Sequence, residues 1–301
     1  MGALPARFRR QRVLIVGCGD VGLRAARFLP ASVQVMALTS SIEKVTALRR
    51  QNITPLVGNL DQPNSLKRLA GLAHRVLHLA PPPNDDPHAR NDPRTQALLR
   101  ALRLRSPPRA VVYGSTSGVY GDCQGQWVDE TRPVQPDTSR AHRRVDAEAQ
   151  LRWFGRSTGV AVHTLRIPGI YAPDREGGTP RGRLLKGTPV LAASDDVYTN
   201  HIHADDLARA CLAALRYGKP QRVTNASDDT DLKMGDYFDL AADLYGLPRP
   251  PRVSRSDAKL QLPAMQLSFM SESRRLSNQR LKRELRIKLR YPTVNEGLKE
   301  A

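Results

Sequence analysis

Short apolar runs rich in β-branched residues alternate with amphipathic stretches along the first half of the chain. Strands buried on both faces are apolar throughout, and helices that pack on a sheet carry apolar residues every three or four positions. Alternation of the two implies right-handed crossovers within a parallel sheet. The pattern therefore predicts an α/β fold with a doubly wound parallel sheet. The expected strands are residues 12–17, 33–38, 53–58, 75–80, 110–115 and 160–167, and the expected helices are 20–29, 41–51, 63–72, 93–104 and 143–157.

The second half of the chain has a looser pattern, in which proline, glycine and charged residues dominate positions 168–190. No internal repeat or low-complexity linker separates the two halves. We therefore expect a first domain at residues 1–168 and a smaller C-terminal lobe at 169–301 that is intertwined with it. The expected elements of the lobe are strands at 197–203 and 223–227 and helices at 205–217 and 233–246.

Three glycines follow the first expected strand in the spacing Gly17-x-Gly19-x-x-Gly22 and open the first helix. This context indicates a dinucleotide-binding turn, in which Gly17 permits a tight turn and Gly19 lets the backbone approach a pyrophosphate. Gly22 lets the helix pack closely on the strand. Unpaired N–H groups at the start of the helix would then bind the anion. The candidate cofactor residues in this segment are Gly17, Cys18, Gly19, Asp20, Val21 and Gly22.

The end of the second expected strand lacks the acidic residue that normally holds the ribose hydroxyls of NAD. Thr39, Ser40 and Ser41 stand there instead, and Lys44 follows closely. Without a carboxylate, a 2′-phosphate is not repelled, and the three hydroxyls and the lysine offer it partners. We therefore expect NADP to be preferred over NAD.

Four further motifs follow in order: STSGVYG at 115–121, LRIPGIYAP at 165–173, NHIHADDLARA at 200–210, and RRLSNQRLKRELRIKLRYPTVNEGL at 274–298. With the glycine turn, they make the sequence resemble the extended short-chain dehydrogenase/reductase superfamily, and within it the NAD-dependent epimerase/dehydratase family. The resemblance covers nearly the whole chain, with Ala172 in place of a family glycine. It implies a Rossmann fold, an NAD(P) cofactor and a small-molecule substrate such as a nucleotide sugar.

The resemblance also assigns catalytic positions. Thr116 takes the place of the Ser or Thr that orients the substrate hydroxyl or carbonyl. The family's proton-carrying tyrosine and ribose-binding lysine, counted back from Glu148, fall on Arg140 and Arg144. Arg144 keeps a positive charge for the ribose, but Arg140 stays protonated near pH 7 and cannot replace a phenol as a proton carrier. The resemblance therefore points to an atypical member that lacks the Tyr-x-x-x-Lys pair.

Other interpretations of the segment around residues 139–148 remain open. Arg140, Arg144, Glu148 and Arg152 recur every four residues, which is also the spacing of a solvated helix stripe with ion pairs around the glutamate. Acid–base catalysis without the tyrosine would need another group that titrates near neutral pH. The candidates are His142, Tyr113, Tyr120 and Asp122, of which His142 is nearest in the sequence.

The resemblance also implies further candidate residues for binding the substrate and the cofactor. Arg181 and Arg183 lie in the loop where related enzymes contact the nucleotide part of a substrate, and a guanidinium can bind a diphosphate in bidentate fashion. Tyr120 and His201 are the other substrate candidates. The remaining cofactor candidates are Asn59, Leu60, Leu79, Ala80, Pro81, Arg144 and Pro168.

Composition changes this picture little. The net charge of +18 favours anionic partners, but the basic residues are spread along the chain without interleaved aromatics, which argues against nucleic-acid binding. Neither the three cysteines nor the His201-x-His203 pair has the companions of a metal site, so no metal is expected. No apolar run approaches the roughly 18 residues of a membrane span, and no signal peptide is evident, so a cytoplasmic location is expected.

These observations predict a cytoplasmic NAD(P)-dependent oxidoreductase or epimerase/dehydratase-type enzyme that acts on a small molecule, with a homodimer implied by the resemblance. Two other classes remain open. The missing tyrosine and lysine suggest a non-catalytic NADP-binding sensor or scaffold. The charge alone suggests a basic nucleic-acid-associated protein.

Overall fold

The computed structural model describes residues 10–299, and it divides into two compact units between which the chain passes several times. The first unit holds the residues up to Ser115, Thr138–Leu165 and Ala208–Val223. The second unit holds Thr116–Asp137, Arg166–Leu207 and the residues from Thr224 onward. Each unit is thus made of segments from several parts of the chain. The division into domains at residue 168 stays a prediction.

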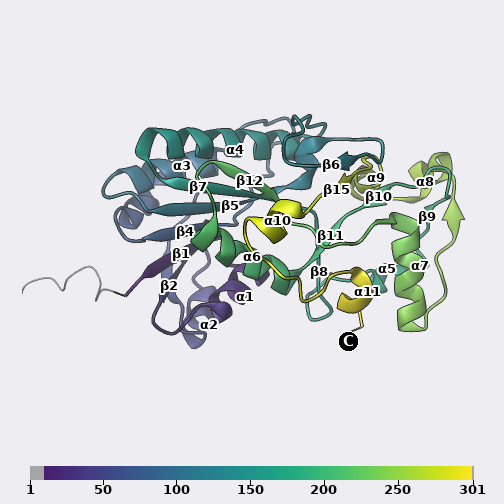
Figure 1. Ribbon diagram of the computed structural model, residues 1–301, viewed down its shortest axis with the longest axis horizontal. Coiled ribbons are helices and arrows are strands. Elements are labelled where there is room, and N and C mark those ends of the chain that lie inside the picture. The colour runs from purple at the N-terminus through teal and green to yellow at the C-terminus, as the bar shows by residue number, and fades with distance from the viewer. Residues whose placement is uncertain (1–9, 300–301) are drawn as a thin grey trace, which may run out of the picture. The chain divides into compact units, whose positions relative to one another are not determined.

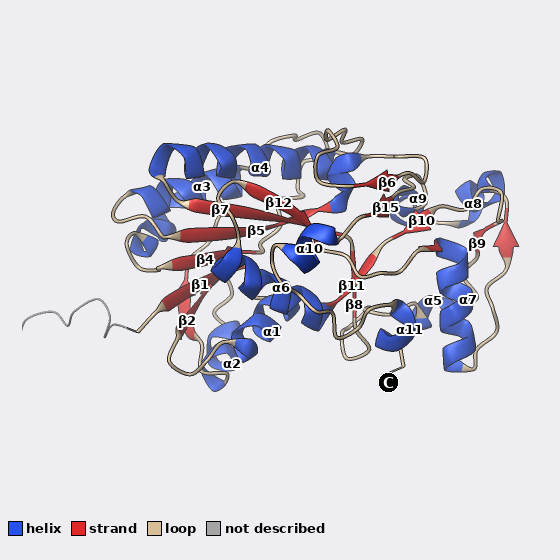
Figure 2. Cartoon of the chain, viewed as in Figure 1, coloured by secondary structure: helices blue, strands red, loops and turns tan. Residues whose placement is uncertain are grey.

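A seven-stranded parallel sheet in the order β12-β7-β5-β4-β1-β2-β3 confirms the predicted α/β class (Figures 1 and 2). The six strands expected in the first half are all present. The strand expected near 223–227 is β12, which completes this sheet at its edge instead of belonging to a separate lobe. The strands are β1 (Arg12–Val16), β2 (Gln34–Thr39), β3 (Thr54–Val57), β4 (Arg75–His78), β5 (Ala110–Thr116), β7 (Ala161–Ile167) and β12 (Arg222–Asn225).

Helices cover both faces of this sheet in the first unit, α1 and α2 on one face and α3 and α4 on the other (Figure 1). The helix expected at 63–72 is instead the short 3-10 helix η2, because Pro63 at its start and Gly71 (φ +69°) after it leave too few residues for a stable α-helix. The elements are α1 (Asp20–Phe28), α2 (Lys44–Arg50), η2 (Pro63–Leu69), α3 (Pro93–Arg103), α4 (Ser139–Thr158) and α6 (Ala204–Tyr217).

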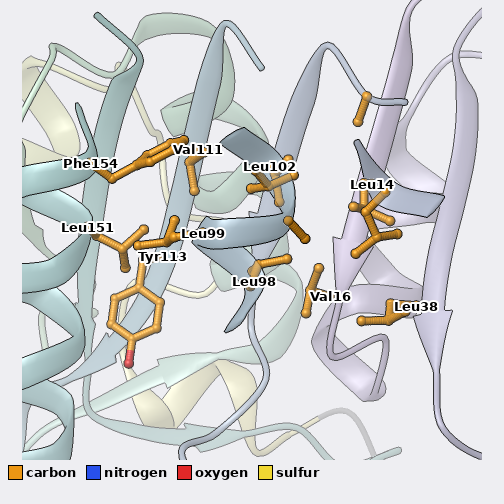
Figure 3. Close-up of a cluster of buried hydrophobic side chains, with 14 of the residues drawn as sticks. Leu14, Val16, Leu38, Leu98, Leu99, Leu102, Val111, Tyr113, Leu151 and Phe154 are labelled. Carbon is orange, nitrogen blue, oxygen red and sulfur yellow. The ribbon is translucent and has the colours of Figure 1, made fainter. Parts of the chain in front are cut away.

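The main core of the first unit lies between the sheet, α3 and α4 (Figure 3). Leu14 and Val16 alternate with residues of the opposite face along β1 and are fully buried here. Burying a leucine or phenylalanine side chain contributes about 1.5–3 kcal/mol. The labelled members of this core are Leu14, Val16, Leu38, Leu98, Leu99, Leu102, Val111, Tyr113, Leu151 and Phe154.

The second unit is built from short strand pairs and small helices. The single strand expected at 197–203 is broken at Asn200, whose side chain instead bonds the backbone of Arg274 and Leu276. The elements are η3 (Ser117–Tyr120), β6 (Trp127–Val128), β8 (Gly169–Tyr171), α5 (Arg181–Leu185), β9 (Val190–Leu191), β10 (Tyr198–Thr199), β11 (His201–His203), β13 (Leu232–Lys233), α7 (Met234–Tyr245), β14 (Arg252–Val253), α8 (Arg255–Gln261), α9 (Ala264–Phe269), β15 (Arg275–Leu276), α10 (Gln279–Arg283) and α11 (Val294–Gly297).

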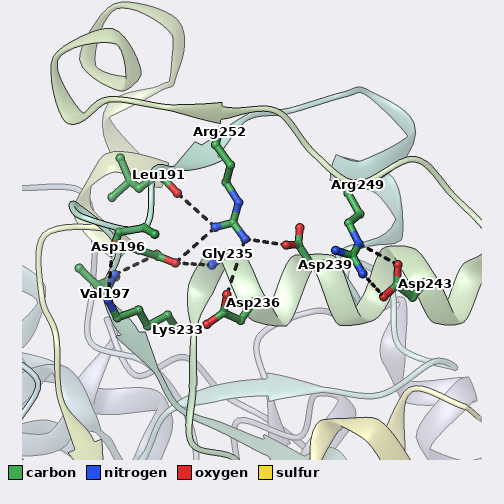
Figure 4. A network of polar contacts seen from close by, with 11 residues as sticks. Leu191, Asp196, Val197, Lys233, Gly235, Asp236, Asp239, Asp243, Arg249 and Arg252 are labelled. Atoms are coloured by element: carbon green, nitrogen blue, oxygen red, sulfur yellow. Dashed lines mark hydrogen bonds and ion pairs between the residues drawn. The ribbon is translucent and has the colours of Figure 1, made fainter.

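Arg252 joins β14 and β9 to the start of α7 in the second unit (Figure 4). Its guanidinium lies 2.7 Å from Asp239 and donates at 3.2 Å to the carbonyl of Leu191. Asp196 accepts from the backbone N–H of Gly235 at 2.9 Å and lies 3.5 Å from the same guanidinium. These polar contacts link the short elements β9, β14 and α7.

Among residues 10–299, no helix has the length and apolar composition of a membrane-spanning segment.

Replacing Phe154 with alanine should lower the free energy of unfolding by about 3–5 kcal/mol, because it leaves a cavity between α4 and the sheet. Trp153, its neighbour on α4, is 61% exposed, so Trp153→Ala should cost less than about 1 kcal/mol. Denaturant unfolding followed by circular dichroism measures both values. Similar losses for the two variants would contradict the core described here.

Candidate functional site

The glycine turn joins β1 to α1 in the first unit. Gly17 has φ +85°, and a Cβ there would lie 2.3 Å from the backbone nitrogen of Ala80, so only glycine fits. A Cβ on Gly19 would meet no atom within 4 Å. Gly19 also precedes the first residue of α1, and no side chain caps that helix start. The turn therefore leaves open space beside the N–H groups at the start of α1 and the positive end of the helix dipole.

The other residues of this turn support its shape. A Cβ on Gly22 would lie 3.1 Å from the Ile15 side chain, which shows how closely α1 packs on β1. Asp20 accepts a hydrogen bond from Arg24 at 3.0 Å, one turn further along α1. Val21 is buried, and burial raises the pKa of the Cys18 thiol to about 11. Cys18 is thus a neutral thiol near pH 7.

The end of β2 presents fewer free hydroxyls than the sequence suggested. The Thr39 hydroxyl accepts from the N–H of Ser41 and donates to its carbonyl, both at 3.2 Å. Its only proton is therefore used within the turn. Ser40 and Lys44 are exposed, and Ser41 is half-buried. These three side chains remain available for a 2′-phosphate.

The loops after β3 and β4 are tied together by Arg94 of α3. Its guanidinium binds both oxygens of Asp61 at 2.7 Å and donates to the carbonyl of Pro81 at 3.3 Å. Asn59 accepts the backbone N–H of Asp61 and stabilises the β3 loop from within. The structure thus brings Asn59 and Leu60 toward the loop of Leu79, Ala80 and Pro81. Arg94 could not be identified from the sequence, because its partners lie far from it along the chain.

Arg144 on α4 is half-buried against β5. Its Nη1 donates to the Gly114 carbonyl at 2.7 Å and to the Tyr113 hydroxyl at 3.1 Å. Glu148, one turn later, is 4% exposed and accepts from the Ser115 hydroxyl at 2.6 Å. The interpretation of this helix face as a solvated charged stripe is therefore wrong for Arg144 and Glu148, which face the sheet. Arg140, at the family's tyrosine position, is exposed.

A buried polar chain beneath Arg144 was not expected from the sequence. The Thr95 hydroxyl donates to Asp92 at 2.6 Å, and it lies 2.9 Å from His78 Nε2. Because the threonine proton goes to the carboxylate, His78 Nε2 must donate to Thr95. Burial lowers the pKa of His78 to about 3, and burial raises that of Tyr113 to about 12. Neither group exchanges protons near pH 7, so Tyr113 does not fill the place of the missing tyrosine.

The candidates that follow β5 belong to the second unit. Thr116 is half-buried and accepts from the N–H of Gly118 at 3.2 Å. Tyr120 is 1% exposed, and its hydroxyl donates to Asn225 at 2.8 Å. Asp122 accepts the backbone N–H of Ser273 at 2.8 Å. Thr116 is therefore half-buried and Asp122 is exposed, while Tyr120 is buried with its hydroxyl bonded to Asn225. Pro168 lies in the same unit and is half-buried.

The substrate candidates Arg183 and His201 both lie close to Tyr237. The Arg183 guanidinium lies 4.4 Å over the ring of Phe238, and burial lowers its pKa. The rings of His201 and Tyr237 are 4.2 Å apart, and burial lowers the pKa of His201 to about 4. Arg183 Nε and Nη2 and His201 Nδ1 are buried without a hydrogen-bond partner among residues 10–299. Arg181, by contrast, is exposed.

The start of α6 is held by contacts of His203 and Asp206. Asp205 and Asp206 lie in the first turn of the helix, and His203 Nδ1 accepts the N–H of Asp205 at 3.2 Å. Asp206 instead accepts the backbone N–H groups of Arg290 and Tyr291. Within the described chain, no group of three or more His, Cys, Asp and Glu side chains gathers as a metal site would require.

The fold and the glycine turn define a dinucleotide-binding protein of the Rossmann class. Comparison with protein families matches residues 13–227 to the NAD dependent epimerase/dehydratase family. The chain belongs to this family, and the resemblance expected from the motifs is confirmed.

Individual relatives are distant. A trifunctional UDP-glucose 4,6-dehydratase/UDP-4-keto-6-deoxy-D-glucose 3,5-epimerase/UDP-4-keto-L-rhamnose-reductase of Arabidopsis thaliana is 25% identical over 162 residues, 51% of this chain and 24% of that protein. The alignment thus spans about a quarter of that relative.

Two solved structures have similar folds. A functionally unknown conserved protein from Silicibacter pomeroyi DSS has a TM-score of 0.78 at 29% identity, over 96% of this chain and 97% of that one. A UDP-glucose 4-epimerase from Thermotoga maritima with UDP-glucose has a TM-score of 0.79 at 19% identity, over 96% of each chain.

The buried carboxyl group of Asp228 should make the stability of the protein depend on pH. It is 4% exposed, and burial raises its pKa from 3.8 to about 8. The folded protein therefore binds this proton more tightly than the unfolded chain does, so stability falls as the pH rises from about 4 to about 8. Asp228→Asn should remove this dependence and stabilise the protein by about 1–3 kcal/mol at the alkaline end.

Thermal unfolding of Asp228→Asn and wild type at both ends of that pH range measures the effect. Glu176→Gln, which changes an exposed carboxylate, serves as the control and should follow the wild type. A variant at 228 that loses stability with pH as steeply as the wild type would contradict the assignment.

Proposed function

We propose that this protein is an NAD(P)-dependent enzyme of the oxidoreductase or epimerase/dehydratase type, that its substrate is a nucleotide sugar, and that NADP is its preferred cofactor. The glycine turn carries this proposal. The space beside Gly19 and the uncapped start of α1 suit a pyrophosphate, whose negative charge the helix dipole favours. When bound, the cofactor would supply a nicotinamide that accepts or returns a hydride.

The preference for NADP rests on the end of β2. Ser40, Ser41 and Lys44 offer hydroxyls and a positive charge, and no carboxylate stands at residues 39–41 to repel a 2′-phosphate. Thr39 no longer counts among these partners, because its hydroxyl is used by Ser41. The half-buried Arg144 would add a positive charge for the nicotinamide ribose.

The substrate class rests on Arg183. A buried guanidinium without an anionic partner is costly, and a phosphate oxygen from a bound ligand would relieve that cost. The unpartnered His201 Nδ1 near the same tyrosine adds a second polar atom that a ligand could satisfy. The UDP-glucose in the Thermotoga maritima structure is a ligand of this chemical kind. A nucleotide sugar carries both the phosphates and the hydroxyls that such an enzyme would transform.

One observation favours a second function, a non-catalytic NADP-binding sensor or scaffold. Arg140 is exposed at the family's tyrosine position, and Arg144 is held by Tyr113 and Gly114. A sensor would bind the cofactor as tightly as an enzyme but would show no hydride exchange with any nucleotide sugar.

Gly19→Val tests cofactor binding without disturbing the fold. Gly19 has φ −87° and open space at its Cβ position, so a larger side chain should be tolerated while it fills the room for the pyrophosphate. Affinity for NADP should fall by about 100-fold or more, as expected from the loss of several charge-assisted hydrogen bonds. Gly182→Ala, at another open glycine, is the control.

Fluorescence titrations with NADP and NAD measure these affinities. Equal cofactor affinity in Gly19→Val and wild type would refute the site, and tighter binding of NAD than of NADP by the wild type would refute the stated preference.

Arg183→Ala should weaken UDP-glucose binding by about 10–150-fold, which corresponds to the 1.5–3 kcal/mol of a hydrogen bond to a charged group. Arg183→Lys should recover only part of the loss, because an ammonium cannot bind a phosphate in bidentate fashion. Isothermal titration measures both. Arg249→Ala, which removes a surface partner of Asp243, should leave binding unchanged, and an equally small effect at residue 183 would argue against the phosphate contact.

A further inference from the structure

Two oxygen atoms from distant parts of the sequence flank Gly118, just after β5. A Cβ placed on Gly118 would lie 3.6 Å from Thr116 Oγ1 and 3.9 Å from Glu272 Oε2. Gly118 has no side chain, so the position that its Cβ would take lies between a hydroxyl and a carboxylate. A substrate hydroxyl that reaches Thr116 would therefore also be close to Glu272. Both residues belong to the second unit.

The segment that carries Glu272 is held firmly in this place. Ser273 accepts the backbone N–H groups of Cys123 and Gly125 with its carbonyl, both at 3.0 Å, and donates its own N–H to Asp122 at 2.8 Å. Arg275 starts the strand β15, which pairs with β6 beside the same loop. These bonds hold the residues that directly follow Glu272 against the segment 122–128.

The two carboxylate oxygens of Glu272 differ in their surroundings. Oε2 accepts from Arg274 Nη1 at 2.7 Å, and the same nitrogen donates to the Gly121 carbonyl at 2.7 Å. No hydrogen bond to Oε1 is found among residues 10–299, and 12% of the side chain stays exposed. One oxygen thus orients the carboxylate, while the other is available to a ligand.

We propose that Glu272 is the catalytic acid–base residue of this chain, in place of the missing tyrosine; this inference rests on the proposed function. Arg140 cannot exchange a proton near pH 7, whereas a carboxylate can accept one. In alcohol oxidation the substrate O–H bond breaks and its proton moves to the carboxylate of Glu272, while its electron pair becomes the second carbonyl bond. A bound oxidised nicotinamide would supply the acceptor for the hydride that leaves the same carbon. Reduction reverses both transfers.

The first test measures binding alone, with UDP-glucose and cofactor-free protein in an isothermal titration. Gly118→Ala would place a methyl group between Thr116 and Glu272 at ordinary contact distances, so it should fold normally but occupy the space for the hydroxyl. Glu272→Gln should remove the charged acceptor. Each variant should lower UDP-glucose affinity by about 5–30-fold, with the melting temperature of Gly118→Ala unchanged.

The second test measures hydride transfer between UDP-glucose and NADP, followed by the absorbance of the reduced nicotinamide. Glu272→Gln should lower kcat by about 10²–10⁴-fold, while the Kd for NADP stays within about twofold of wild type. Added formate should restore turnover to Glu272→Ala, because a small carboxylate can take the vacant place. A residue that only supports the fold would show no such rescue. Asp243→Asn breaks another carboxylate–arginine pair of the second unit and should retain full activity.

The outcomes separate this inference from the proposed function. If the wild type binds both ligands and transfers hydride, but Glu272→Gln and Gly118→Ala do the same, Glu272 is not the acid–base residue and the proposed function stands. If the wild type binds NADP but transfers no hydride, both the acid–base role and the enzymatic function are overturned. Reduced affinity, reduced kcat and rescue by formate together would establish the role.

Discussion

The close approach of the Gly17 backbone to the backbone of Ala80 is the constraint on which the rest of the first unit depends. A Cβ at position 17 would collide with the backbone of Ala80, which follows β4. Only glycine can therefore occupy the turn between β1 and α1 at this position. The turn places the start of α1 over the end of the sheet and leaves the space at Gly19 open. Gly22 then allows α1 to lie close to β1. One steric condition thus produces both the packing of the helix and the candidate phosphate site.

Helix α4 shows how the same scaffold can hold chemistry that differs from the family pattern. Thr138 caps its start, and Gly159 ends it in the left-handed conformation. The face that carries Arg144 and Glu148 still points at β5, and the sheet still supplies polar partners to it. The fold therefore tolerates the replacement of tyrosine and lysine by arginines, because the helix is held by Leu151 and Phe154 and not by the catalytic positions.

Most elements of the first unit and the glycine turn could be predicted from the sequence. The elements and contacts that were missed have physical reasons. The strands and helices of the first half follow from local periodicity, and the glycine turn follows from its position after a strand. The 3-10 helix at η2 was missed because periodicity does not register how few residues lie between a proline and a glycine. The sequence did not show that β12 joins the main sheet beside β7. Which strand pairs at the edge of a sheet depends on the tertiary structure and not on the strand's own residues. Arg94, Glu272 and the chain from His78 to Asp92 were missed because their partners are far away in sequence.

The sequence by itself determined the α/β class, the dinucleotide-binding turn and the family, because each depends on the order and spacing of residues along a continuous segment. The tertiary structure decided which polar groups are free to act. In the folded chain the Thr39 hydroxyl bonds within a turn, Tyr113 and Tyr120 are buried, and Thr116 and Glu272 lie on either side of Gly118. Burial and hydrogen bonding are properties of the packed chain, in which a residue's neighbours come from distant segments. A pattern read along the chain therefore cannot show them.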